Sequence, residues 1–417
     1  MAEKIVALSI GSKNISAAIA NDNEGEFTIL DTIVRPSKGI SKGKIAKVDL
    51  AIESVVEVLE ELSKMNFEKI PSVYISLGTE NIRIVKNTGV YLSEYKNTIL
   101  TQKEVKKAYI NGKNINSEND EYIVDAIIRK VRVNNNEILE SPMGIESSSL
   151  EIDLDVIIAK KDFIDDVKSM FTRIGCEING FLLGVESLKQ IFLVDNNNAN
   201  NLIIDFGGEK TEFIYFEDGR VANIGYIPLG GVNITKDLSI VTTYSEEVME
   251  VIKKKNSSSY STFRNDFAKI EVLEDYVEAD LFYDIINARF EEILNYVKKE
   301  LEYSGVYDKI ENITILGDGI GSFEKINLLI EDILQKKVNV FTKNELNIEK
   351  SSIITPIAIV KEVYDRVKLL GDDSNEVEVS FKRETYVKEV EEESFDEVKI
   401  VKKKGLSKVL GFLGDIF

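Results

Sequence analysis

The feature that most constrains this chain is an internal repeat whose two copies lie almost half the chain apart, at residues 4–34 and 201–227. In each copy an apolar run ends at glycine, and two further β-like runs follow, each after a turn. The equivalent positions are Ser9 and Asp205, Gly11 and Gly207, and Ile15 and Thr211. A repeated three-strand meander in a chain of 417 residues predicts a split fold with two related lobes.

Composition excludes several classes of chemistry. The chain has no His, which removes Ser-His-Asp triads, His-ligated zinc and imidazole proton shuttles. Cys176 stands alone, so we expect a reducing compartment and a buried structural thiol. The formal charge of −20 disfavours a nucleic-acid partner. The N-terminal apolar run is too short for a signal peptide or a spanning helix, and no later run approaches ~18 apolar residues, so we expect a soluble protein.

Between and after the meanders, apolar residues recur with helical spacing. The helices expected are 48–66, 162–174, 185–193, 245–255, 270–302 and 323–335. Further strands are expected at 73–77, 82–85, 131–133, 150–159 and 313–316. The expected parts are a first-lobe core (1–80 and 161–195), an insert subdomain (81–160), a second-lobe core (196–232 and 305–370), an outer subdomain (233–304), an acidic linker (371–401) and a C-terminal helix (402–417).

Three glycine-rich turns are candidates for a phosphate site, since backbone amides converge on an anion where side chains are absent. They are Gly11-Ser12-Lys13-Asn14, Gly207-Gly208-Glu209-Lys210-Thr211 and Gly317-Asp318-Gly319-Ile320-Gly321. The third turn lies between an expected strand and an expected helix, whose N-terminus favours negative charge. An ordinary hairpin turn remains the alternative for each motif taken alone.

These duplicated strand–glycine–strand units resemble the actin, Hsp70 and sugar-kinase ATPase superfamily, and within it the FtsA family of bacterial cell-division proteins. Three segments are similar to motifs of that family: Ile227-Pro228-Leu229-Gly230-Gly231-Val232-Asn233-Ile234-Thr235, Glu250-Val251-Ile252-Lys253, and Asn287-Ala288-Arg289-Phe290-Glu291-Glu292. The resemblance covers essentially the whole chain. It implies an α/β, actin-like, two-lobed fold on a duplicated mixed β-sheet core, with an FtsA-type insert in the first lobe.

The resemblance also implies a nucleotide cleft, with ATP as a cofactor bound weakly and Mg²⁺ as a doubtful one. The residues expected to bind nucleotide are Gly11, Ser12, Lys13, Asn14, Asp205, Gly207, Gly208, Lys210, Thr211, Gly230, Gly231, Glu250, Lys253, Gly317, Gly319 and Gly321. Asp205 is the expected residue for the metal, and no catalytic residue is assigned. Glu250 and Lys253 are also spaced as an ordinary surface pair on a helix.

The nucleotide motifs depart from the family pattern. Ser9 stands where the family has the Asp that holds the water shell of Mg²⁺. In the second turn, Glu209, Lys210 and Glu212 replace Gly, Thr and Asp. A carboxylate directed at phosphates opposes binding unless it faces away, and Lys210 is a candidate to compensate as a cation. The alternative is that Glu209 and Lys210 are solvated turn residues.

The last residues read as an amphipathic membrane-binding helix that follows an acidic linker. Lys402, Lys403 and Lys404 precede an apolar arc suited to an anionic bilayer. The residues expected to contact the membrane are Leu406, Val409, Leu410, Phe412, Leu413, Ile416 and Phe417. Docking of this helix onto the protein's own surface is the alternative.

The function expected from the resemblance is that of an adaptor. It tethers filaments of the tubulin-like protein FtsZ to the cytoplasmic face of the membrane at the division site, self-assembles into protofilaments, and hydrolyses ATP weakly or not at all. Arg289 is the expected contact for the FtsZ C-terminal peptide, although a charged helix residue is often simply solvated. The rivals are a sugar or acid kinase of the same superfamily and a pilus-assembly scaffold similar to PilM.

Overall fold

The computed structural model describes residues 4–23, 26–95, 98–138, 141–193, 199–260, 268–341 and 350–371, which lie in one compact unit, Met1–Val379. The expected C-terminal helix lies outside these residues, as does the expected linker apart from Gly371. In the described part of the chain, no helix is both long enough and apolar enough to cross a membrane.

The first lobe is built on a five-stranded mixed sheet in the order β13-β6-β1-β2-β3. Its strands are β1 (Ile5–Ile10), β2 (Asn14–Asn23), β3 (Glu26–Pro36), β6 (Ser72–Leu77) and β13 (Glu177–Leu183). The first three form the expected antiparallel meander, and β6 and β13 extend it as parallel strands. A small hairpin of β4 (Ile40–Ser41) and β5 (Lys44–Ile45) follows the meander.

The second lobe repeats this sheet. Its order, β16-β15-β14-β19-β20, corresponds strand by strand to β3-β2-β1-β6-β13 in the first lobe. Its strands are β14 (Asn201–Phe206), β15 (Thr211–Glu217), β16 (Arg220–Ile227), β19 (Asn312–Leu316) and β20 (Val338–Val340). Again the meander is antiparallel and the two later strands are parallel to its first strand. The expected duplicated mixed-sheet core is therefore confirmed.

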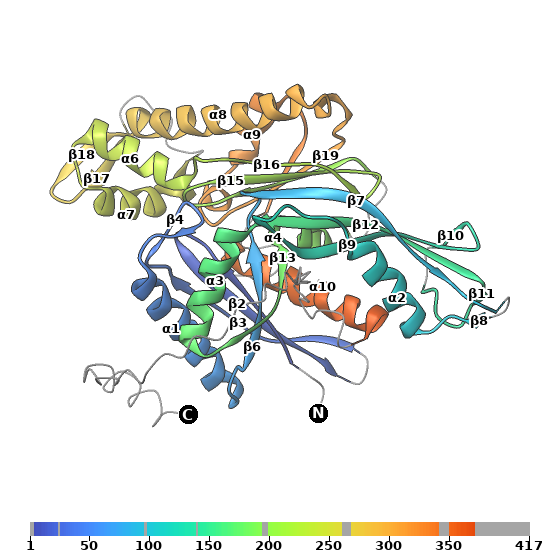
Figure 1. Ribbon diagram of the computed structural model, residues 1–417. Helices are drawn as coiled ribbons and strands as arrows, with labels where there is room; N and C mark the ends of the chain where they lie inside the picture. Colours follow the sequence, from blue (N-terminus) through green and yellow to red (C-terminus); the bar gives the residue numbers. More distant parts are fainter. Residues whose placement is uncertain are drawn as a thin grey trace, which may run out of the picture. The chain divides into compact units, whose positions relative to one another are not determined.

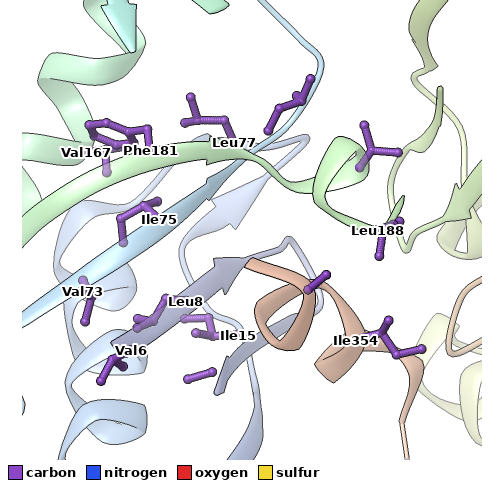
Figure 2. Close-up of a cluster of buried hydrophobic side chains, with 14 of the residues drawn as sticks. Val6, Leu8, Ile15, Val73, Ile75, Leu77, Val167, Phe181, Leu188 and Ile354 are labelled. Atoms are coloured by element: carbon purple, nitrogen blue, oxygen red, sulfur yellow. The ribbon is translucent and has the colours of Figure 1, made fainter. Parts of the chain in front are cut away.

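Helices cover both faces of the first sheet (Figure 1). They are α1 (Val48–Asn66), α3 (Lys161–Ile174) and α10 (Ile354–Leu370). Because side chains alternate along a strand, Val6 and Leu8 of β1 pack with α1 and α3, whereas Ala7 packs with α10. Figure 2 shows the apolar layer on the Val6 and Leu8 side. The expected helix at 185–193 is two short helices, α4 (Gly184–Ser187) and α5 (Lys189–Phe192).

The insert forms a separate four-stranded sheet in the order β10-β9-β12-β7, with one helix on it. Its elements are β7 (Ile82–Leu92), β8 (Thr98–Ile99), α2 (Gln102–Lys113), β9 (Glu121–Val133), β10 (Asn136–Ile138), β11 (Glu146–Ser147) and β12 (Ser149–Lys160). Helix α2 was not expected from the sequence. It approaches β7 closely because Gly89 lacks a side chain: a Cβ there would lie 1.9 Å from the carbonyl oxygen of Ala108.

Helices dominate the outer part of the second lobe (Figure 1). They are α6 (Gly231–Thr242), α7 (Glu246–Asn256), α8 (Ala279–Tyr303) and α9 (Ile326–Leu334), and a hairpin of β17 (Lys269–Val272) and β18 (Asp275–Glu278) precedes α8. Short 3-10 helices lie at Ser257–Ser259, Tyr307–Lys309, Ile320–Ser322 and Ser351–Ile353. The helix expected from residue 270 therefore begins at Ala279. Ile270 and Val272 alternate as in a strand, and Leu273 turns the chain with φ of 57°.

Buried charges fasten the insert to α10. The guanidinium of Arg366 donates to both carboxylate oxygens of Asp125 on β9, and to Glu362 at 2.7 Å. The Ser187 hydroxyl donates to the other oxygen of Glu362 at 2.6 Å. Burial opposes ionisation of Glu362, but the charges of Arg366 and Lys189 and the hydrogen bonds from Arg366 and Ser187 together outweigh it and lower the pKa of this carboxyl. The insert is thus held to the first lobe by paired, buried charges.

Candidate functional site

A cavity of about 460 Å³ lies between the two lobes, where the glycine turns of the two sheets face each other. The β1–β2 turn and the β14–β15 turn line it, together with the residues after β19 and the first residues of α6. The expected site residues that line it are Gly11, Ser12, Lys13, Asn14, Asp205, Gly207, Gly208, Lys210, Gly231, Glu250, Lys253, Gly317 and Gly319. The fold therefore gathers residues that are more than 300 positions apart.

Three expected residues, Thr211, Gly230 and Gly321, are not among the lining residues. The buried Thr211 hydroxyl donates to the carbonyl of Leu229 at 2.9 Å. A Cβ on Gly230 would lie 2.5 Å from the carbonyl oxygen of Gly207, so glycine lets α6 approach the turn. The amide of Gly321 donates to the carbonyl of Gly317 at 3.1 Å. These residues shape the walls of the cavity.

The first amides of α6 are already hydrogen-bonded. Gly231 and Val232 donate to the carbonyls of Gly207 and Gly208 at 3.1 and 2.8 Å. A helix N-terminus attracts an anion through such free amides. Here the contact instead ties α6 to the β14–β15 turn.

Lys253 and Glu250 form a largely buried ion pair that links α7 to α6, rather than a surface pair. We call this ion pair the Lys253 pin. The Lys253 ammonium is 5% exposed and donates to the Gly231 carbonyl (3.0 Å), the Thr235 hydroxyl (2.7 Å) and Glu250 (2.6 Å). Burial lowers the pKa of Lys253. Burial also opposes ionisation of Glu250, but the charge of Lys253 and the hydrogen bonds from Lys253, Thr235 and Lys254 together outweigh it and bring the pKa of Glu250 to about 2. All three protons of the ammonium are used within the protein, which joins α6 to α7.

The β14–β15 turn carries the departures from the family pattern, and its side chains bind the first lobe. Glu209 lines the cavity and accepts from the Lys42 backbone amide at 2.5 Å and the Ser41 hydroxyl at 3.2 Å. Lys210 is bound by Glu80 at 2.7 Å and by Glu212 at 3.0 Å. Lys210 is therefore not a solvated turn residue, because two carboxylates match its charge, whereas the contacts of Glu209 lie at an exposed part of the turn.

Asp205 pairs with Glu212 across β14 and β15 and so lies beside these carboxylates. Burial raises the pKa of Asp205 to about 7, and the nearby Glu212 charge adds to this effect. Across the cavity, the Asp318 carboxylate accepts hydrogen bonds from the Asn14 side-chain amide at 2.9 Å, the Ser351 hydroxyl at 3.0 Å and the Ser352 backbone amide at 3.1 Å. The first turn and the third turn are thus joined through Asp318.

With Lys210 in place, the donor set does not fit Mg²⁺. Among the residues that the structure describes, no three His, Cys, Asp or Glu side chains are grouped so as to hold a metal ion. Ser9, which also lines the cavity, brings no charge. The ammonium of Lys210 lies between the carboxylates that remain. Lys13 also lines the cavity, and among the described residues it has no carboxylate partner, which leaves its ammonium available to an anionic ligand.

Sequence reasoning missed Thr79 and Glu80, which complete the group on the first-lobe side. The Thr79 amide and hydroxyl donate to Glu212 at 2.5 and 3.0 Å. A signal was available, because both residues follow the carboxyl end of a parallel strand, β6, where α/β sheets place ligand-binding residues. Asp318 belongs to the third glycine-rich turn, which was already a candidate for the phosphate site.

Arg289, the expected partner contact, lies outside the cavity on α8. Its guanidinium binds Asp237 of α6 through two hydrogen bonds of 2.6 and 2.9 Å, and it also donates to Glu292. These carboxylates raise the pKa of Arg289 further above its usual range. Its charge is therefore matched within the protein.

Comparisons with known proteins agree with this architecture. The family model described as "Cell division protein FtsA" matches residues 202–358. The chain is 24% identical to the cell division protein FtsA of Bacillus subtilis, over 88% of this chain and 85% of that protein. It is also 24% identical to FtsA of Neisseria meningitidis, over 84% of this chain and 87% of that protein.

Solved structures show the same fold at lower identity. A chain of the PilM-PilN type IV pilus biogenesis complex superposes with a TM-score of 0.58 at 14% identity, covering 87% of this chain and 98% of that one. MreB 5 of Spiroplasma citri, solved bound to AMPPNP, gives a TM-score of 0.51 at 12% identity, covering 88% and 98%. The fold is accordingly actin-like, and over most of its length the chain is similar to cell division proteins FtsA.

Proposed function

We propose that this chain is a membrane adaptor of bacterial cell division. Its C-terminal residues 402–417 bind the anionic inner leaflet of the cytoplasmic membrane, its body assembles into actin-like protofilaments, and its second lobe captures the C-terminal peptide of FtsZ. The similarity to FtsA proteins over most of the chain supports this role at the division site.

The observation that favours tethering over turnover is the cation in the cleft. A kinase or an ATPase of this superfamily uses carboxylates to hold Mg²⁺ against the phosphates. Here Lys210 is bound between Glu80 and Glu212, and Ser9 replaces the metal-positioning Asp. We therefore expect at most weak, metal-independent binding of ATP and negligible hydrolysis, which disfavours the kinase alternative.

The outer subdomain of the second lobe offers a surface for a peptide. Several large apolar side chains are exposed on its helices and hairpin: Ile240, Val241, Val251, Leu273, Tyr276 and Leu281. An FtsZ peptide with acidic and apolar residues would pair its carboxylates with Arg289 and its apolar groups with this surface. Since Asp237 already binds Arg289, the peptide carboxylate must displace that side chain.

Co-sedimentation with anionic vesicles, run beside an ATPase assay, tests the proposed function. The full chain should pellet with the vesicles, and removal of Gly405–Phe417 should leave it in the supernatant, because seven apolar side chains at the interface contribute several kcal/mol at ~25 cal/mol/Å². Vesicle binding that survives the truncation would contradict the membrane assignment. Substrate-dependent turnover at an enzyme rate would favour the kinase alternative.

A further inference from the structure

The polar contacts across the cleft converge on the β14–β15 turn. Lys210 and Glu212 belong to the second lobe, whereas Glu80 follows β6 of the first-lobe sheet. The Lys210 ammonium lies 2.7 Å from a Glu80 oxygen and 3.0 Å from a Glu212 oxygen. One ammonium therefore joins carboxylates that come from different lobes.

Two neighbouring contacts strengthen this connection. Glu212 accepts from both the amide and the hydroxyl of Thr79, and Glu209 accepts from the Lys42 amide and the Ser41 hydroxyl. Every donor belongs to the first lobe and every acceptor to the turn of the second. We call the set of Ser41, Lys42, Thr79, Glu80, Glu209, Lys210 and Glu212 the interlobe latch.

The backbone around the latch leaves space for it. A Cβ on Gly78 would lie 2.2 Å from the Lys210 ammonium nitrogen, and a Cβ on Gly43 would lie 2.9 Å from a Glu80 oxygen. Gly43 and Gly78 both belong to first-lobe loops. Side chains at these positions would push the charged ends of Lys210 and Glu80 aside, so glycine here leaves room for the ion pair.

The three charged side chains are largely buried, which strengthens the electrostatic interactions between them. The side chains of Lys210, Glu80 and Glu212 are 20%, 15% and 13% exposed, so water screens them much less than it screens a surface pair. Without the ammonium, two carboxylates would face each other at close range and repel. The Lys210 ammonium between them removes this repulsion and so favours contact between the lobes at the turn.

We propose that Lys210 is a built-in counter-cation, which ties the two lobes together and takes the place that a divalent metal would otherwise occupy between Glu80 and Glu212. An apolar seam that includes Val185, Leu188 and Ile214 joins the lobes beside α4 and acts as the pivot. The chain thus holds its lobes together at this turn by its own side chains. This inference does not depend on the membrane or on the filament partner.

The test measures the distance between the lobes of the full chain by double electron–electron resonance. Spin labels are placed at Glu57→Cys on α1 and Glu291→Cys on α8, both exposed, in a Cys176→Ala background. The unmodified latch should give one narrow distance distribution that Mg²⁺ does not change. Lys210→Met should broaden the distribution and lengthen the distance, because the two carboxylates then repel.

The second part of the experiment adds Mg²⁺ to the variants. Excess Mg²⁺ should restore the narrow distribution in Lys210→Met, since it bridges the two carboxylates, but not in Lys210→Met combined with Glu80→Gln. The matched control is Lys254→Met, which removes a cation that lines the same cavity but is 69% exposed and binds only Glu250. This control should keep the unmodified distribution.

Several outcomes would overturn the proposal: an unchanged distribution in Lys210→Met, equal broadening in Lys254→Met, or no restoration by Mg²⁺. If circular dichroism shows that Lys210→Met does not fold, Gly78→Ala replaces it. This variant keeps every charge and a backbone that alanine can adopt, but its Cβ displaces the ammonium. A narrow, unchanged distribution in Gly78→Ala would then count against the latch.

Discussion

Ser9 and Asp205 occupy the same position in the two copies of the duplicated sheet. Ser9 pairs with Ser16 across the first meander, and Asp205 pairs with Glu212 across the second. Both side chains line the cleft. One copy therefore places two hydroxyls where the other places two carboxylates, and this difference governs the chemistry of the cleft.

The first prediction concerns hydrolysis. We expect negligible ATP hydrolysis and a nucleotide affinity that changes little with Mg²⁺, because one carboxylate without its partner gives poor support to a metal. Ser9→Asp should make nucleotide binding depend more strongly on Mg²⁺ in calorimetric titrations. Lys13→Ala should weaken whatever binding remains, since Lys13 is a cation that lines the cavity. Turnover of about 1 per second or more in the unmodified protein would refute the prediction.

The second prediction concerns the Lys253 pin. Lys253→Met should lower the free energy of unfolding by about 2 kcal/mol, because Glu250 and Thr235 lose a buried partner. Chemical denaturation measures this change. Lys254→Met, which removes a largely exposed charge from the same carboxylate, is the control and should have an effect of about 0.5 kcal/mol or less.

The same pin predicts a pH dependence. The pKa of Glu250 is about 2 in the folded chain and about 4.3 in an unfolded one, so its contribution to stability is complete above the unfolded value. It should be lost as the pH falls from about 4.3 towards 2. In Lys253→Met this segment of the stability curve should be flatter. Parallel curves for the two proteins over this range would contradict the assignment.

The third prediction concerns the fastening of the insert. Arg366→Met should destabilise the chain by about 3–5 kcal/mol, because Asp125 and Glu362 become buried, unpaired charges. Lys361→Met on the same helix removes a more exposed pair with Asp365 and should cost about 0–1 kcal/mol. Equal midpoints for the two variants in thermal unfolding would show that the buried network contributes little.

The fourth prediction concerns the peptide contact. Arg289→Glu should weaken binding of the FtsZ C-terminal peptide by more than about tenfold, measured by calorimetry. Asp237→Asn should strengthen it, because the peptide no longer competes with an internal carboxylate for the guanidinium. A purely structural Arg289 would give weaker binding in both variants, and unchanged affinity in Arg289→Glu would remove it from the site.

The fifth prediction concerns the tail. Replacing Leu410 and Leu413 with Glu should abolish vesicle binding, because charge then enters the acyl boundary while the helix keeps its length. The control is Ser407→Glu, which adds a charge on the polar face and should reduce binding only modestly. Equal losses in the two proteins would indicate simple electrostatic repulsion rather than burial of an apolar face.

The internal repeat and the equivalence of Ser9 with Asp205 could be predicted from the sequence, because an apolar strand that ends at a glycine turn is a local pattern. It extended α8 too far towards the N-terminus, since Ile270 and Val277 also suit a helical period, and only the turn at Leu273 separates them. The partners of Lys210 were not accessible from the sequence. Glu80 lies 130 positions away, and the fold alone brings the two side chains together.

The most direct measurement of the adaptor role is co-sedimentation of a labelled FtsZ C-terminal peptide with anionic vesicles. We predict that the peptide pellets only when the full chain is present. It should remain in solution with the chain lacking Gly405–Phe417, and with Arg289→Glu. A peptide that stays in the supernatant although the full chain pellets with the vesicles would contradict the account.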